Sequence, residues 1–86
     1  MTAAQARHRA VVSAITQILR AERERQGLSM NALATRAGLS QQMVSYVERE
    51  MRNPTLDTVL RMTGALGVNL ADVINAANRR VDRHKK

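Results

Sequence analysis

Few side chains in this sequence could do catalytic or metal chemistry. The chain has no cysteine, which excludes a disulfide framework and a thiolate metal site. Its two histidines, His8 and His84, lie near opposite ends, and no carboxylate pair stands where a cleft is expected. Asp57 and Asp72 fall at expected helix starts, where a negative charge is favourable. The sequence therefore predicts neither an enzyme nor a metal or cofactor site.

The residues best suited to recognition by hydrogen bonding are two adjacent glutamines, Gln41 and Gln42. A glutamine amide offers both a donor and an acceptor, which matches the N6 and N7 edge of adenine. Ser45 and Tyr46 follow closely, and Tyr46 is the only aromatic residue in the chain. We expect Tyr46 either to contact a bound partner or to pack its ring against the start of the next helix.

Five helices are expected to position these residues. Apolar residues recur at helical spacing, and strand-like alternation is nearly absent. Ser29, Ser40 and Thr55 suit helix N-caps, while Gly27 and Gly38 suit helix ends. The expected helical ranges are 4–26, 30–36, 41–49, 56–66 and 70–78.

The third of these helices has one apolar side. Val44 and Val47 define it, and Leu33, Ala37 and Leu39 supply other inward positions. At steps of about 100° per residue, the opposite face carries four polar or amphipathic residues. They are Gln42, Ser45, Tyr46 and Arg49, with Gln41 at the N-terminal tip.

Residues 30–49 form a twenty-residue unit with demanding positions. Ala34 falls where two helices cross, and a larger side chain would push them apart. Gly38 falls in a turn that needs a positive φ angle. Val44 is the apolar anchor of the second helix. The short connection requires the two helices to cross steeply, which predicts a helix-turn-helix.

These residues resemble the Cro/C1-type (XRE) helix-turn-helix family of phage repressors and bacterial regulators. The resemblance is carried by GLSMNALATRAGLSQQMVSYVERE and RNPTLDTVLRMTGALGVNLADVI. It implies an all-α, compact, five-helix lambda-repressor-like domain whose second motif helix enters the major groove of double-stranded DNA. It also implies base reading by Gln41 and Gln42, with Ser45 and Tyr46 as further candidates, in a transcriptional repressor or autoregulator.

The resemblance also assigns supporting roles around the motif. A basic residue late in the first helix of the family meets the glutamate that closes the recognition helix, which here pairs Arg23 with Glu48. Glu48 also needs a cation because it lies near a helix C-terminus. Phosphate contacts are expected from donors flanking the motif. These are Ser29, Asn31, Ser40, Arg49, Arg52 and Asn53.

Three features depart from the family pattern. The first motif position is Met30 instead of the usual glutamine, so one phosphate contact is missing. Glu50 replaces the usual glycine after the recognition helix, which strains or reshapes that turn and adds a negative charge near DNA. The first helix also starts earlier than in the usual unit.

The formal net charge is +7, which favours a polyanionic partner. The last eight residues carry five of the fourteen basic side chains and one acidic side chain. We therefore expect a single domain over 1–78 and a basic C-terminal tail over 79–86. No apolar stretch approaches the roughly 18–20 residues that span a membrane, and no signal peptide is evident. A cytoplasmic protein of a bacterium or phage is expected.

A homodimer on a palindromic operator is expected, because one short helix gives limited specificity. The candidate surface is the apolar face of the fifth helix, comprising Leu70, Val73, Ile74 and Ala77; packing onto the chain's own core is the alternative. The extended N-terminal segment is a second candidate surface. Two other roles share this fold: an antitoxin that binds a toxin protein as well as its operator, and a restriction-modification controller.

Overall fold

The computed structural model describes residues 1–84, and these residues form five α-helices and no strand. The all-α prediction is confirmed. The last two residues of the predicted basic tail, Lys85 and Lys86, lie outside the described range. The helices are α1 (Ala3–Arg25), α2 (Met30–Ala37), α3 (Gln41–Glu48), α4 (Leu56–Leu66) and α5 (Leu70–His84).

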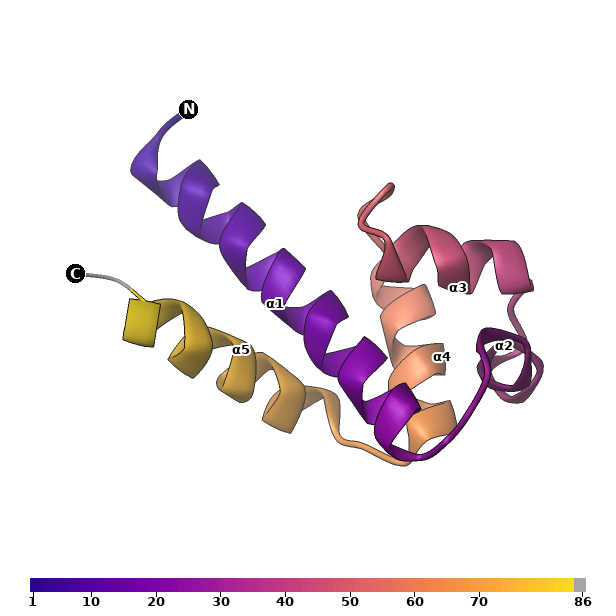
Figure 1. The fold of residues 1–86 in the computed structure, drawn as a ribbon. Helices are drawn as coiled ribbons and strands as arrows, with labels where there is room; N and C mark the ends of the chain where they lie inside the picture. The colour runs from indigo at the N-terminus through magenta and orange to yellow at the C-terminus, as the bar shows by residue number, and fades with distance from the viewer. Residues whose placement is uncertain (85–86) are drawn as a thin grey trace.

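The helices divide into two groups along the long first helix. α1 and α5 run antiparallel and side by side, while α2, α3 and α4 gather beside the C-terminal half of α1 (Figure 1). The N-terminal turns of α1 and the last turns of α5 therefore extend beyond the other three helices. None of the helices in residues 1–84 combines the length and apolar character needed to cross a bilayer.

Local sequence signals set the helix ends. Side-chain oxygens of Thr2, Ser29, Ser40 and Thr55 each accept a backbone N–H three residues later, which satisfies donors that the first helical turn leaves free. Gly38 ends α2 at φ 69°, and the Leu39 N–H donates to the Ala34 carbonyl at 2.9 Å. The turn between α2 and α3 therefore uses the left-handed conformation that the glycine predicted.

The core is aliphatic. Leu19, Leu33, Val44, Val47 and Met62 are fully buried and bring α1, α2, α3 and α4 into one cluster. Ala34 is buried where α2 meets α3, as the small side chain predicted. Burial of Val44 and Val47 fixes which side of α3 faces inward.

Two leucines of α4 do not join the core. The sequence places Leu56 and Leu60 with Val59, Thr63 and Leu66 in a single apolar set, but Leu56 is 67 % and Leu60 50 % exposed. Met62 is fully buried instead. At about 100° per residue, the buried arc of α4 is centred near Leu66, so Leu56 falls at its edge and Leu60 falls outside it.

The fifth helix is longer than predicted. It continues from Leu70 to His84, through most of the segment expected to be a tail after residue 78. Contacts with α1 account for the extension: Arg7 pairs with Asp82 at 2.6 Å, and the Arg80 guanidinium donates to the Gln17 amide oxygen at 3.5 Å. The partners in each contact are distant in sequence, so no local sequence pattern could predict that α5 continues past residue 78.

A buried ion pair joins the ends of α1 and α3. Arg23 donates from Nε to Glu48 Oε2 at 2.7 Å and from Nη2 to Oε1 at 2.9 Å. Its Nη1 donates to the Leu28 carbonyl at 2.6 Å, and the side chains are 10 % and 1 % exposed. The hydrogen bonds that Arg23 donates to the Glu48 carboxylate raise the pKa of Arg23 above its ordinary value. The ion pair predicted between Arg23 and Glu48 is therefore present.

Substitution of one partner should be costly. In Arg23→Ala the Glu48 carboxylate would be buried without a cation, so the free energy of unfolding should fall by about 3–5 kcal/mol. Urea denaturation followed by far-ultraviolet circular dichroism measures it. Arg25→Ala is the matched control, because Arg25 pairs with Glu22 at the surface. Loss of this exposed pair should change the free energy of unfolding little. Similar losses for the two variants would contradict the assignment.

Candidate nucleic-acid interface

The outward side of α3 carries the residues predicted to read bases. Gln41 and Gln42 are exposed, whereas Ser45 and Tyr46 are half-buried. The side opposite them is held by fully buried Val44 and Val47. The four candidate residues therefore share a surface that α1, α2 and α4 leave uncovered.

Three side chains on this surface contact one another. The Gln42 amide donates to the Tyr46 hydroxyl at 2.5 Å, and the Arg52 guanidinium lies over the Tyr46 ring, 5.0 Å from its centroid. A guanidinium at that distance is attracted to the ring face. Tyr46 therefore packs against Arg52 of the loop after α3. Among residues 1–84, the Gln41 side chain makes no hydrogen bond.

The residues predicted to bind phosphate surround α3 and are all exposed. They are Ser29, Asn31, Ser40, Arg49, Arg52 and Asn53. Ser29 and Ser40 cap α2 and α3, so their positions are fixed by the helices. Arg49, Arg52 and Asn53 follow α3 in the loop that projects beside it (Figure 1). The structure thus places donors at both ends of α3.

Glu50 has a left-handed backbone, with φ 57°. Its N–H donates to the Val47 carbonyl at 3.0 Å, and the next N–H, of Met51, donates to the Tyr46 carbonyl at 2.9 Å. This pattern is a Schellman motif, in which glycine is the favoured residue. Of the two outcomes that the sequence left open, a strained turn and a reshaped one, the structure shows the strained left-handed turn, in which the non-glycine residue bears the steric cost.

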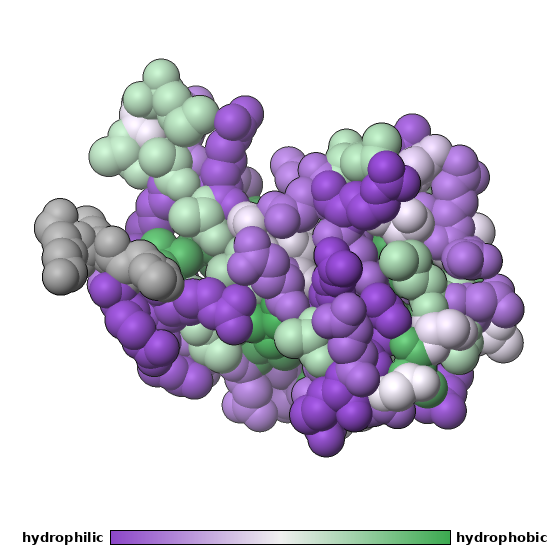
Figure 2. All heavy atoms as spheres, in the orientation of Figure 1, coloured by the Kyte–Doolittle hydropathy of each residue, from purple (hydrophilic) through white to green (hydrophobic). Residues whose placement is uncertain are grey.

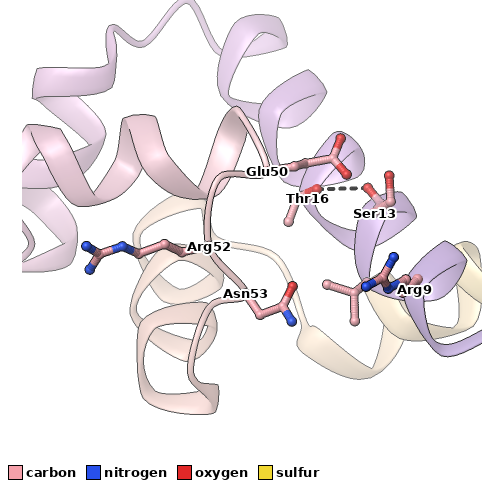
Figure 3. A pocket seen from close by; sticks show the side chains of 7 residues that line it. Arg9, Ser13, Thr16, Glu50, Arg52 and Asn53 are labelled. Carbon is pink, nitrogen blue, oxygen red and sulfur yellow. Dashed lines mark hydrogen bonds between the residues drawn. The ribbon is translucent and has the colours of Figure 1, made fainter. Parts of the chain in front are cut away.

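A cavity of about 350 Å³ separates this loop from α1. Figure 3 shows Glu50 pointing toward Thr16, Asn53 on the side of Arg9, and Arg52 leaving in the opposite direction. Seen from outside, the molecule is hollowed between the first turns of α1 and this loop (Figure 2). Arg9 and Ser13 are not among the residues that the sequence predicted for this site. Their polar stripe with Thr16 at helical spacing was the available signal.

A second cavity, of about 290 Å³, lies between α1, α4 and α5 and has mostly apolar walls. We call it the apolar groove; it is lined by His8, Val12, Ile15, Asn53, Pro54, Leu56, Val59, Leu70 and Ile74. The exposed Leu60 lies one turn after Leu56 on α4. Of these residues, the sequence predicted an association surface only at Leu70 and Ile74.

The structure divides the four residues of the predicted dimer surface. Val73 and Ala77 are 5 % and 0 % exposed, so they pack inside the chain and cannot meet a partner in this fold. Leu70 is half-buried and Ile74 is 37 % exposed. The correction follows from α5 lying along α1, which covers one side of the helix.

Replacing Glu50 should change stability through the backbone alone. Glu50→Gly removes the steric cost of the left-handed backbone, which is roughly 1–2 kcal/mol, but it also raises the conformational entropy of the unfolded chain. The free energy of unfolding should therefore rise by a net amount of about 0.5–1 kcal/mol. Glu50→Gln keeps the side chain and should give no such gain. Urea denaturation of both variants measures the difference, and an equal gain in Glu50→Gln would point to charge instead of φ.

Comparison with known proteins agrees with this geometry. The family model described as helix-turn-helix matches residues 19–73. A helix-turn-helix-type transcriptional regulator of Sinorhizobium fredii is 38 % identical over 52 residues, covering 60 % of this chain and 68 % of that protein. The immunity repressor protein of Bacillus phage phi105 is 32 % identical over 60 residues, covering 70 % of this chain and 42 % of the repressor. This chain thus matches less than half the length of the phage protein.

Solved structures share the fold. The wild-type restriction-modification controller protein C.Esp1396I superposes with a TM-score of 0.77 at 20 % identity, covering 86 % of this chain and 96 % of that one. The clp gene regulator ClgR from C. glutamicum gives a TM-score of 0.72 at 26 % identity, covering 81 % and 91 %. The helix order, the glycine turn and the family match together place this chain in the Cro/C1-type helix-turn-helix family of DNA-binding, non-enzymatic transcriptional regulators.

Proposed function

We propose that this protein is a transcriptional repressor that reads the major groove of operator DNA with α3 and binds as a homodimer. The observation that carries the proposal is the outward polar face of α3, whose opposite side is fully buried and whose end is held by the Arg23–Glu48 pair. The major groove is wide enough to admit an α-helix presented in this way. A relative that is named an immunity repressor supports repression, as opposed to activation, of transcription.

Gln41 is the principal base reader in this proposal. It lies at the N-terminal tip of α3, is exposed, and has its amide available to pair with the N6 and N7 edge of adenine. Gln42 is oriented by its bond to Tyr46, and Tyr46 by Arg52. Gln42, Tyr46 and Arg52 therefore present a preformed surface, while Ser45 is short enough to sit close to a base or sugar.

Phosphate groups are held at both ends of α3. Ser29 and Asn31 begin α2, where backbone N–H groups and the helix dipole favour an anion. Ser40 begins α3 and contributes in the same way. At the other end Arg49, Arg52 and Asn53 supply side-chain donors. Such contacts set the register on the duplex and carry no sequence information themselves.

The apolar groove and the adjacent leucine supply the dimer surface. Leu56, Leu60 and Ile74 are large apolar residues exposed to solvent, and a contiguous apolar patch of this kind marks an interaction site. The occupant proposed is a second copy of this chain, because a two-fold dimer presents two copies of α3 to two half-sites. Leu70 completes the patch.

Two substitutions should separate base reading from phosphate binding. Gln41→Ala should lower the preference at one base position by ~1–3 kcal/mol, whereas Arg49→Ala should weaken binding to all sequences and reduce the salt slope by about 1. Selection from a random duplex pool, followed by binding titrations on the selected and a scrambled duplex, measures both effects. The pool should yield a palindrome with half-sites one helical turn apart. Equal loss on both duplexes for Gln41→Ala would refute its role.

Association should depend on the exposed leucines. Leu56→Ser with Leu60→Ser should shift sedimentation velocity profiles toward the monomer across a micromolar concentration series, because the apolar area buried between copies is reduced. Met51→Ser is the matched control, since Met51 is 58 % exposed but lies in the loop outside the groove. A wild-type chain that stays monomeric with and without operator DNA would refute the dimer. The groove would then be open to a different protein, as in the antitoxin alternative.

A further inference from the structure

The first turns of α1 precede the residues that the family model matches. α1 begins at Ala3, whereas the family match begins at residue 19. These turns project past α3 on the side where the loop after α3 also projects (Figure 1). The cavity of about 350 Å³ lies between the two. The first turns of α1 therefore form one wall of the cavity, opposite the loop that follows α3.

The walls of this cavity are polar on both sides. α1 contributes the polar residues Arg9, Ser13 and Thr16 beside the apolar Val12, and the loop contributes Glu50, Arg52 and Asn53. Thr16 already donates its hydroxyl to the Ser13 carbonyl at 2.8 Å. Arg9 and Asn53 are both exposed, and they line the same cavity from opposite sides (Figure 3). A guanidinium and an amide facing one space are suited to the oxygens of an anion.

Arg9 differs from its neighbour Arg7. Arg7 pairs with Asp82 of α5 at 2.6 Å, so its charge serves the contact between α1 and α5. No carboxylate lies within 4.0 Å of the Arg9 guanidinium among residues 1–84. One arginine thus faces α5 and the other faces the loop after α3.

We propose that the first turns of α1 are a second DNA-contacting wall, in which Arg9 and Asn53 hold one backbone phosphate between them. The inference rests on the proposed function, because it assigns a further contact to the same duplex. Glu50 lies in the same cavity and repels a phosphate, but it points toward Thr16. The phosphate is therefore seated at the Arg9 end, away from the carboxylate.

The salt dependence of DNA binding tests this contact. The full chain and Arg9→Ala are titrated with the selected duplex and with a scrambled duplex over a series of salt concentrations. Loss of one phosphate contact should reduce the slope of log K against log salt by about 0.9, equally on both duplexes. Arg9→Lys, which keeps the charge, should retain most of the slope. Thermal melts confirm that the exposed substitutions leave the fold intact.

Arg83→Ala is the matched control. Arg83 is also an exposed helical arginine, but it belongs to α5, on the other side of α1 from α3 (Figure 1). Its removal changes the net charge by the same amount and should leave the slope unchanged. Phosphate ethylation interference adds a positional readout: one phosphate whose ethylation blocks the wild type should have no effect on Arg9→Ala.

The outcomes are distinguishable. Equal slopes for Arg9→Ala and the wild type, or equal losses for Arg9→Ala and Arg83→Ala, would overturn this inference and leave the proposed function standing. A wild-type chain that binds no duplex at low salt would overturn the proposed function, and this inference with it. A lower slope confined to Arg9→Ala, together with the missing interference signal, would support it.

Discussion

The orientation of α3 depends on a buried ion pair at its last turn. Arg23 and Glu48 are nearly removed from solvent, and the third guanidinium contact reaches the Leu28 carbonyl just before α2. One side chain of α1 thus ties the end of α3 and the entry to α2. Burying two charges is costly unless geometry and hydrogen bonding are good. The pair therefore tolerates few other arrangements of these three segments, which is the constraint a presented recognition helix requires.

Many of the helix boundaries are determined by interactions between residues close together in the sequence. The caps Ser29, Ser40 and Thr55, together with Gly38, set helix boundaries through interactions within a few residues, so pattern reasoning found them. The left-handed position of Glu50 was identifiable only through the family resemblance, in which a glycine is usual there. The Arg23–Glu48 pair spans 25 residues and was accessible only because the chain resembles a family that contains it.

The remaining features depend on packing between distant segments. The end of α5 could not be predicted because Asp82 meets Arg7 across 75 residues. The exposure of Leu56 and Leu60 depends on which arc of α4 the other helices cover. Likewise, α1 covers Val73 and Ala77 and leaves Ile74 outside. The contact of Gln42, Tyr46 and Arg52 and the cavity beside Arg9 arise from the path of the loop after α3, which periodicity does not describe.

The absence of other aromatic residues gives Tyr46 a second significance. The chain contains no Trp or Phe and a single Tyr, and that ring lies between Gln42 and Arg52 on the outward surface of α3. The near-ultraviolet absorbance and intrinsic fluorescence of the whole molecule therefore originate at one place. Those signals report on the recognition surface and its occupants, while the aliphatic core, which has no chromophore, can rearrange without altering them directly.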